Sequence, residues 1–331
     1  MKKLRTLSVL LVLARAIASV GISTATEPNQ PQGENIELPA TANSSLLEQQ
    51  QIAQELALIH EGEHRGLEQL KMGRIWAKLA SDYEDESELV KAEDAYNHAL
   101  RQLEPSSSER VDYAVVLDNL GSLYDMMGNL RASELCRRRS LGLREKLGDP
   151  LETARGKAHL AGVHLGMHKY KNARREALEA YNEMVALKNP DTGEIVSTLF
   201  TLSYATCTGG GCSDSLEYAR RAWSLASGAL PGDSLQVGLA HMALGYAEWK
   251  AEIKDAPDEE MRKGIEIVKA QGSQGNPPYL LSSLEQYRKY LEAVRREPEA
   301  EQLAVEEAQL KKQSGKCANC TVSVHGLEHK H

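Results

Sequence analysis

The sequence predicts an all-α protein built as an array of antiparallel helical hairpins, and three observations support this prediction. The 331-residue chain is 41% apolar and 26% charged and contains one Phe, while the helix formers Ala, Leu, Glu, Lys and Arg are abundant. An apolar pattern of helical period recurs along the chain. Breaks that contain Pro or Gly separate the recurring units. We therefore expect about five or six hairpins behind an N-terminal capping helix.

A Leu followed by a small residue marks each unit. This dipeptide recurs at intervals of 41, 40, 42 and 42 residues as Leu79-Ala80, Leu120-Gly121, Leu160-Ala161, Leu202-Ser203 and Leu244-Gly245. A second helical pattern follows each dipeptide and carries small residues that would let two helices approach closely. These residues are Ala92, Ala99, Ser133, Ser140, Ala173, Ala180, Ser215 and Ala222.

Residues 1–25 have the three parts of an export signal: basic Lys2, Lys3 and Arg5, an apolar stretch, and small residues before a cleavage site after Ala25. We expect the mature protein in the periplasm or outside the cell, where disulfides persist. Arg15 interrupts the apolar stretch, so a cytoplasmic protein with a basic amphipathic start, or a signal retained as an anchor, remains the alternative.

The rest of the chain divides by composition. Residues 26–43 contain three prolines and little apolar surface, which predicts a disordered linker. Residues 44–72 should form the capping helix, beginning near Leu46, and residues 73–313 the repeat array. Residues 314–331 form a tail rich in Cys and His.

Charge argues against nucleic-acid binding. The chain carries 39 basic and 47 acidic residues, a formal charge of −8. Removing residues 1–25, which hold four basic residues and no acidic one, leaves 35 against 47, or −12. Such a chain has no general attraction for phosphate backbones. We also expect no stable membrane span after signal removal, no small-molecule substrate, no cofactor and no bound metal.

At the repeat residues the chain resembles tetratricopeptide repeat (TPR) proteins. One unit is carried by Trp76, Leu79, Ala80, Tyr83, Ala92, Tyr96, Ala99 and Leu100, and the next by Leu117, Asn119, Leu120, Gly121, Tyr124 and Gly128. The period near 42 residues is longer than the usual repeat of about 34 and is similar to that of kinesin light chains. The resemblance covers residues 73 to about 229, weakens after that, and implies a right-handed superhelix ending in a polar cap.

The resemblance also implies a working surface. In such proteins the first helices of successive hairpins line a concave groove that holds a peptide or partner helix. We expect a non-enzymatic scaffold that binds a protein or peptide there, with apolar anchors towards the C-terminal end. Arg155 and His159 would recognise acidic or carbonyl groups, and Asn119 matches the asparagine that pairs with peptide backbone. The predicted groove residues are Asn119, Ser122, Arg155, His159, Phe200, Tyr204, Met242, Tyr246 and Trp249.

Four cysteines are candidates for disulfides. Cys207 and Cys212 flank a Thr-Gly-Gly-Gly turn that brings them together, so a local disulfide is expected; two free thiols are the alternative if the chain is not exported. The pair Cys317 and Cys320, spaced as C-x-x-C, favours a structural disulfide, with zinc binding second and thiol catalysis third. A protein that works through this tail, with the array as a presenting scaffold, is the alternative function.

A His-Glu-Gly-Glu-His segment spans residues 60–64 and matches the H-E-x-x-H zinc-protease pattern. His60 and His64 would share one helix face, but Gly62 weakens the helix and no third ligand has a recognisable motif. We therefore interpret the segment as a solvated helix break, and we expect no catalytic site.

Overall fold

A computed structural model describes residues 40–103, 110–208, 212–253, 257–271 and 277–314. The predicted signal, most of the linker and the Cys/His tail lie outside these residues. Helices are the only regular secondary structure in the described chain, and its described residues from Ser44 to Ser314 belong to one compact unit. Among these helices, none is both long enough and apolar enough to cross a membrane.

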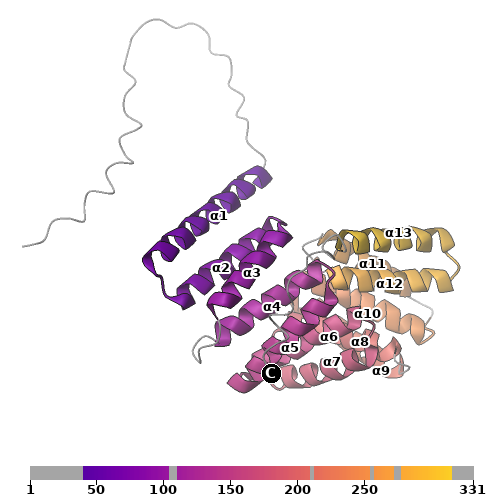
Figure 1. The fold of residues 1–331 in the computed structure, drawn as a ribbon. Helices are drawn as coiled ribbons and strands as arrows, with labels where there is room; N and C mark the ends of the chain where they lie inside the picture. The colour runs from indigo at the N-terminus through magenta and orange to yellow at the C-terminus, as the bar shows by residue number, and fades with distance from the viewer. Residues whose placement is uncertain (1–39, 104–109, 209–211, 254–256, 272–276, 315–331) are drawn as a thin grey trace, which may run out of the picture. The chain divides into compact units, whose positions relative to one another are not determined.

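Thirteen helices follow one another along the described chain (Figure 1). The first, α1 (Ala40–Arg65), begins six residues before the expected start at Leu46. Six hairpins follow it, and within each hairpin the two helices contact each other extensively. They are α2 (Gln69–Asp85) with α3 (Leu89–Gln102), α4 (Arg110–Met126) with α5 (Leu130–Leu147), α6 (Pro150–Gly166) with α7 (Tyr170–Val185), α8 (Thr192–Thr208) with α9 (Cys212–Ala229), α10 (Leu235–Lys250) with α11 (Pro257–Ala270), and α12 (Pro277–Ala293) with α13 (Glu297–Ser314).

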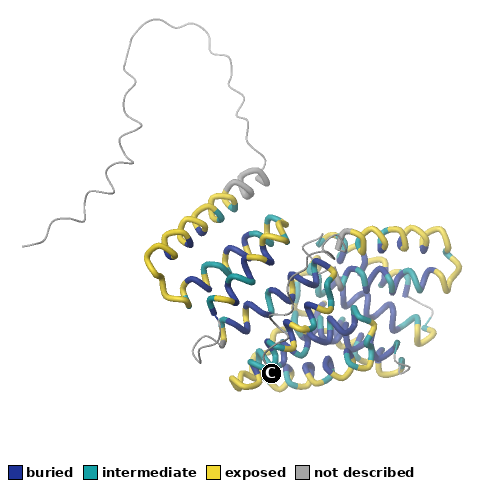
Figure 2. Tube along the Cα trace, viewed as in Figure 1, coloured by how far each residue is buried: buried dark blue, intermediate teal, exposed yellow. Residues whose placement is uncertain are grey.

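The predicted small residues lie where the helices of a hairpin meet. All eight of them, from Ala92 to Ala222, have no exposed surface. Glycine takes the same role in the fifth hairpin, where a Cβ on Gly264 would come within 2.8 Å of the Gly238 carbonyl oxygen. Figure 2 shows the resulting pattern, with buried positions on the packed faces of the hairpins and exposed positions along α1. The expected packing of small residues against a partner helix is confirmed.

Five hairpins turn in the same way. The residue that ends the turn has a positive φ: Ser87, Gly128, His168, Glu252 and Arg295. The next backbone N–H then bonds a carbonyl five residues back, as in Asn129 to Tyr124 at 2.8 Å and Lys169 to His164 at 2.8 Å. This is the Schellman arrangement that satisfies the last carbonyls of a helix. The turn fixes how the second helix of each hairpin returns along the first.

Helix starts match the predicted breaks between units. Asp149 accepts the N–H of Glu152 at 3.1 Å and Pro150 opens α6. Asp191 accepts the N–H of Glu194 at 2.9 Å, and Ser234 accepts that of Val237 at 3.4 Å. These caps satisfy orphan donors at the start of the first helix of the third, fourth and fifth hairpins. Those helices carry most of the predicted groove.

Candidate functional site

The first helix of the last hairpin, α12, covers part of the face on which the candidate site lies. Helix α12 contacts α4, α6 and α10 as well as its neighbours α11 and α13. It therefore lies across the face formed by the first helices of the earlier hairpins, which is the face predicted to be an open groove. Tyr279 at its N-terminal end packs edge-to-face on Phe200, with ring centroids 5.7 Å apart. The sequence predicted only a terminal cap for this hairpin.

The apolar half of the predicted groove is not an open surface in this structure. Phe200 and Met242 have no exposed surface, while Tyr204 and Tyr246 are 2% and 3% exposed. Met242 points at α11, where it contacts Gly264, and Trp249 is half-buried. These residues were expected to face a partner, but α12 and the neighbouring helices cover them. Their role as partner anchors stays a prediction, and only Trp249 of this group is accessible without movement of α12.

The covered aromatic rings form a continuous series. Tyr204 packs edge-to-face on Tyr246 at 5.0 Å, Tyr246 on Trp249 at 5.5 Å, and Trp249 on Tyr290 of α12 at 5.7 Å. Lys289 of α12 reaches the Tyr204 hydroxyl at 3.4 Å. Burial and the nearby Glu285 carboxylate raise the pKa of Tyr204. Because each edge-to-face pair contributes about 0.5–1.5 kcal/mol, this series fixes α12 against α8 and α10.

The polar half of the predicted groove is more open. Ser122 and His159 are exposed, whereas Asn119 and Arg155 are half-buried. Asn119 forms a hydrogen bond with Tyr96 of α3, so its amide already has an internal partner. Arg155 donates to Glu152 at 2.8 Å and lies 3.2 Å from Glu194. Ser122 accepts from Arg137 at 3.2 Å, so three of these four residues have partners within the array and only His159 is left without one of the contacts described here.

Two arginines on second helices also reach this face, and the sequence analysis did not identify them. Arg137 of α5 donates to Asp125 at 2.6 Å and to Ser122 at 3.2 Å. Arg144, one heptad later on the same helix, bonds both Asp118 and Glu152. With Arg155, these pairs form a ladder of charges across α4, α5, α6 and α8. Asp125 Oδ1 and Arg137 Nη1 are buried with no protein partner in the described structure, so the ladder retains unmet hydrogen-bonding capacity.

Three cavities lie along the same face. The first, about 290 Å³, and the second, about 30 Å³, share Asp125, Leu165 and Ser282 in their linings. The second and the third, about 350 Å³, share His159 and Tyr279. Because neighbouring cavities share lining residues, they lie in a row from α4 and α13 to α8 and α10, and we call this row the track. Tyr279 stands at its narrowest part.

His159 is the predicted residue best placed to meet a ligand, because its exposed ring lines two of the three cavities. The surrounding walls desolvate the imidazolium form, and Arg137, Arg144 and Arg155 repel it, so the pKa of His159 is lowered. The neutral ring has one donor and one acceptor nitrogen. It can therefore hydrogen-bond a peptide amide in either direction.

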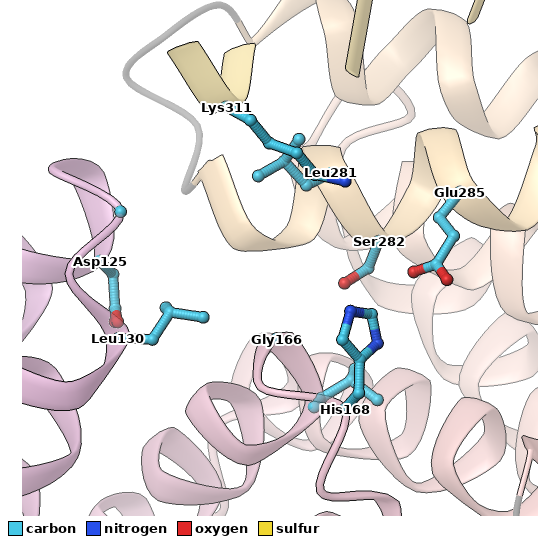
Figure 3. A pocket seen from close by; sticks show the side chains of 10 residues that line it. Asp125, Leu130, Gly166, His168, Leu281, Ser282, Glu285 and Lys311 are labelled. Atoms are coloured by element: carbon cyan, nitrogen blue, oxygen red, sulfur yellow. The ribbon is translucent and has the colours of Figure 1, made fainter. Parts of the chain in front are cut away.

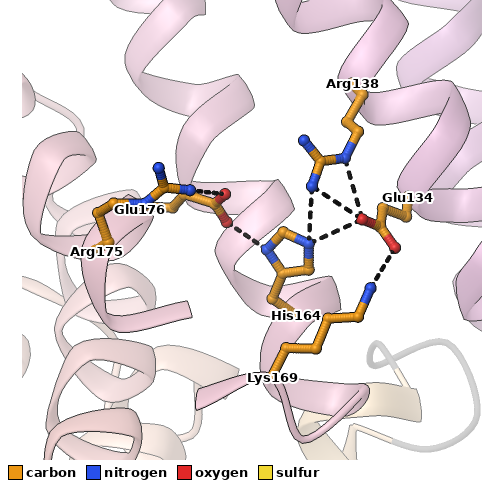
Figure 4. Close-up of polar contacts among 6 residues, drawn as sticks. All are labelled: Glu134, Arg138, His164, Lys169, Arg175 and Glu176. Atoms are coloured by element: carbon orange, nitrogen blue, oxygen red, sulfur yellow. Dashed lines mark hydrogen bonds and ion pairs between the residues drawn. The ribbon is translucent and has the colours of Figure 1, made fainter. Parts of the chain in front are cut away.

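A second polar cluster joins the second and third hairpins away from the cavities (Figure 4). His164 has no exposed surface and lies between Glu134 at 3.1 Å and Glu176 at 2.5 Å. Glu134 also accepts from Lys169 at 2.8 Å and Arg138 at 2.9 Å. Burial opposes ionisation of Glu134, but these three bases outweigh it and lower its pKa to about 2. Each of the six side chains in Figure 4 bonds at least one other member of the cluster, which indicates a structural role.

The remaining sequence motifs have clear positions. Cys207 and Cys212 form a disulfide between the ends of α8 and α9, and Cys136 is a buried free thiol. Cys317 and Cys320 lie outside the described residues. The ring nitrogens of His60 and His64 lie 3.2 Å apart on exposed α1, and no group of three metal-binding side chains occurs in the described parts of the chain. Gly62 between them makes room for α2, since a Cβ there would lie 2.6 Å from Met72 Sδ.

Comparison with known proteins shows the fold. No family model and no curated protein matches the sequence. Among solved structures, BtubC (BKLC) from P. vanneervenii is 18% identical, with a TM-score of 0.55 over 68% of this chain and 92% of that one. A Rap protein complexed with competence and sporulation factor is 13% identical, with a TM-score of 0.53 over 82% and 88%. The apo form of RapI is 12% identical, with a TM-score of 0.58 over 76% and 66%. The chain therefore has the TPR-type repeat fold that its sequence predicts.

Proposed function

We propose that this protein is a non-catalytic scaffold that binds a segment of a partner protein along the track between α12 and the first helices of the second to fifth hairpins. The observation that carries this proposal is the run of three cavities with shared walls. Their walls combine apolar side chains with a few convergent polar groups, which is the composition of ligand sites in general. Solved structures of the same fold include Rap proteins in complex with competence and sporulation factor and with the Phr* peptide, which supports a binding role.

The polar groups of the track suit a polypeptide. The neutral ring of His159, which lines the second and third cavities, offers one donor and one acceptor. A peptide in extended form presents its own N–H and C=O groups along both edges. The His159 ring can pair with either kind of group. The Tyr279 hydroxyl at the narrowest part supplies one more polar contact.

We further propose that the mature protein acts outside the cytoplasm, after removal of residues 1–25. The basic and apolar parts of the signal support this location, as does the disulfide between Cys207 and Cys212. N-terminal sequencing of the protein from its own cells should find Thr26 as the first residue. A chain that still begins at Met1 and fractionates with the cytoplasm would refute this part.

Site-specific photocrosslinking tests the scaffold function. A photoreactive amino acid replaces His159 on the track in one preparation and Lys171, an exposed residue on α7, in the other. We expect a defined partner to crosslink at position 159 and not at position 171. In the otherwise native chain, His159→Trp should block capture of that partner by filling the track, whereas Lys171→Trp should not. Equal crosslinking at the two positions, or capture that survives His159→Trp in a folded protein, would refute the proposal.

A further inference from the structure

The paired histidines of α1, His60 and His64, have no part in the proposed function. Helix α1 runs through the segment that contains them, so the helix break expected there does not occur. The helix ends at Gly66, which has a φ of 67°, and the Leu67 N–H bonds the Gly62 carbonyl oxygen at 2.9 Å. This Schellman closure fixes the last turn of the helix. The two histidines therefore lie one turn apart on a regular helix end.

The packing of α1 directs this pair outward. Gly62 faces α2, because a Cβ there would come within 2.6 Å of Met72 Sδ, and Ile59 is 5% exposed on the same side. In an α-helix, positions 60 and 64 lie about 40° apart and both point away from position 62. Both histidines are accordingly exposed. A solute can reach them without any movement of the array.

The two rings have the spacing of two ligands of one metal ion. Their Nε2 atoms lie 3.2 Å apart, with ring centroids at 4.4 Å and planes at 71°. Imidazole nitrogens bind Zn²⁺ at about 2.0–2.1 Å, so two nitrogens in adjacent coordination positions lie about 3 Å apart. The measured separation already matches this value, which means that a shared ion requires little rearrangement of either side chain.

Without metal, the same contact is a hydrogen bond in which one Nε2–H donates to the other ring. A neutral imidazole can carry its proton on Nδ1 instead. When the donor ring does so, both Nε2 atoms present lone pairs and the neutral pair loses no proton. Metal binding therefore replaces one exposed hydrogen bond, which contributes little in water, by two metal–nitrogen bonds.

The surroundings favour a cation. Glu61 and Glu63 flank the two histidines in the sequence, and Arg65 pairs with Glu61 at 2.7 Å. Two acidic residues against one basic residue leave this helix end with a net charge of −1 when the histidines are neutral. Such a charge raises the local concentration of cations.

The site is open and incomplete as a metal cage. No group of three metal-binding side chains occurs in the described parts of the chain, so water or an outside ligand must fill the other coordination positions. The three cavities of the track, the first of which is shown in Figure 3, are lined by other helices. The pair therefore offers a surface site that holds an ion, and not an enclosed site for hydrolysis.

We propose that His60 and His64 chelate one divalent ion of the class that prefers imidazole, such as Zn²⁺ or Cu²⁺, on the outer face of α1. Nitrogen ligands favour these ions over Mg²⁺ and Ca²⁺, which take oxygen ligands. The sequence led to the expectation of no bound metal because no third ligand had a recognisable motif. The site lies apart from the track and is independent of the proposed scaffold function.

Histidine labelling read by mass spectrometry tests the site in the full-length protein. Diethyl pyrocarbonate acylates a free ring nitrogen, and the peptide that contains residues 60–64 reports on this pair alone, whatever other histidines and cysteines bind. We expect Zn²⁺ to slow the labelling of both rings at least about tenfold and in a saturable way, because the ion occupies both nitrogens. Mg²⁺ at the same concentration should have no effect. Unchanged labelling at saturating Zn²⁺ would overturn the inference.

Two variants test whether the ion needs both rings. His64→Ala should weaken the protection of His60 at least about tenfold, because the second nitrogen no longer acts at high effective concentration. The exchange of His64→Arg with Arg65→His keeps the composition but puts the histidines five positions apart, on different faces of the helix. Protection should fall as far as in His64→Ala. Full protection in the exchange variant would show adventitious binding to single exposed histidines and would refute the chelate.

A third variant separates this site from the Cys/His tail. Cys317→Ser with Cys320→Ser should leave the protection of His60 and His64 unchanged, because the chelate needs only α1. Loss of protection in this variant would show that the tail supplies the main ligands, and the two-histidine site would fall. Circular dichroism verifies that each variant is folded. Crosslinking at position 159 is a separate measurement, so the scaffold function stands or falls independently of these results.

Discussion

The cluster around Glu134 supports a quantitative prediction about stability. Glu134 accepts hydrogen bonds from Lys169, His164 and Arg138, and its pKa is lowered from 4.5 to about 2 although burial opposes ionisation. At 1.36 kcal/mol per pKa unit this difference corresponds to about 3 kcal/mol. Because solvent still reaches these side chains, screening reduces the expected value to about 1–2 kcal/mol. We expect Glu134→Gln to lower the free energy of unfolding by this amount at pH 7.

The sign of the pH dependence follows from linkage. A carboxyl whose pKa is lower in the folded protein stabilises the fold fully above its unfolded value of 4.5. That contribution is lost as the pH falls from about 4.5 towards 2. The glutamine variant has no such group, so its difference from the wild type should shrink between pH 5 and pH 3.

Urea denaturation at pH 7, 5 and 3.5 measures this difference. Hydrogen exchange of the α5–α7 amides shows whether the loss is local, since an array can open one hairpin at a time. Glu145→Gln, an exposed change on the same helix, is the control and should have no effect. A constant difference between Glu134→Gln and wild type from pH 7 to pH 3.5 would refute the electrostatic account, as would full stability of the variant at pH 7.

Three further predictions concern packing and thiols. Replacing Cys207 and Cys212 by Ser should lower the free energy of unfolding by about 2 kcal/mol, which is the chain-entropy value for so short a loop. Thermal unfolding of the wild type with and without reductant measures the loss, and identical curves would contradict the prediction. Gly245→Ala should destabilise the protein strongly, because its Cβ would lie 2.8 Å from a carbonyl oxygen of α11. Gly228 on α9 faces open space, so Gly228→Ala should stabilise the protein by up to about 1 kcal/mol. Chemical denaturation compares the two variants, and equal effects would refute the packing argument. Burial raises the pKa of Cys136 to about 12, so mass spectrometry should find this thiol unmodified by iodoacetamide at pH 8 until the protein is unfolded, and rapid native labelling would show that the core is open.

The fold was predictable because its determinants are local. The repeat of Leu with a small residue, the small residues of the second helices and the capped breaks each act within about 40 residues. Each also has one physical consequence: two helices that pack closely, or the end of one helix followed by the start of the next. Asp149, for example, caps the helix that Pro150 opens, as the Gly-Asp-Pro sequence indicates. The start of α1 at Ala40 was missed because residues 26–43 were assigned as a whole to the linker on the basis of their composition.

The closure of the groove was not predictable from the same signals. Lys289 and Tyr204 are in contact although 85 residues separate them in the chain. Such a contact depends on the small rotations between successive hairpins, which add up along an array. No single dipeptide specifies that sum. The aromatic residues of α8 and α10 were therefore expected on an open surface, whereas α12 covers them. Their number was still informative, because a groove lined with that much apolar surface requires a cover or a partner.

The arginines of the charge ladder show how the polar site could have been found. In the second hairpin, the small residue after Leu120 is Gly121, and a Cβ there would lie 3.0 Å from Cγ of Arg137. Glycine thus admits the arginine stem between the two helices of the hairpin, so that its guanidinium group reaches Asp125 on the face of the first helix. In the fourth hairpin Ser203 stands at this repeat position and bonds Ser215 across the pair at 2.9 Å. Three features therefore mark such a hairpin: a glycine at this position, an arginine opposite it on the second helix, and an aspartate four residues after the glycine. In a hairpin of this kind the guanidinium group of the second helix reaches the binding face formed by the first helices. This combination appears once among the first helices, in the second hairpin, and its aspartate, Asp125, lines the cavities at the α4 end of the track.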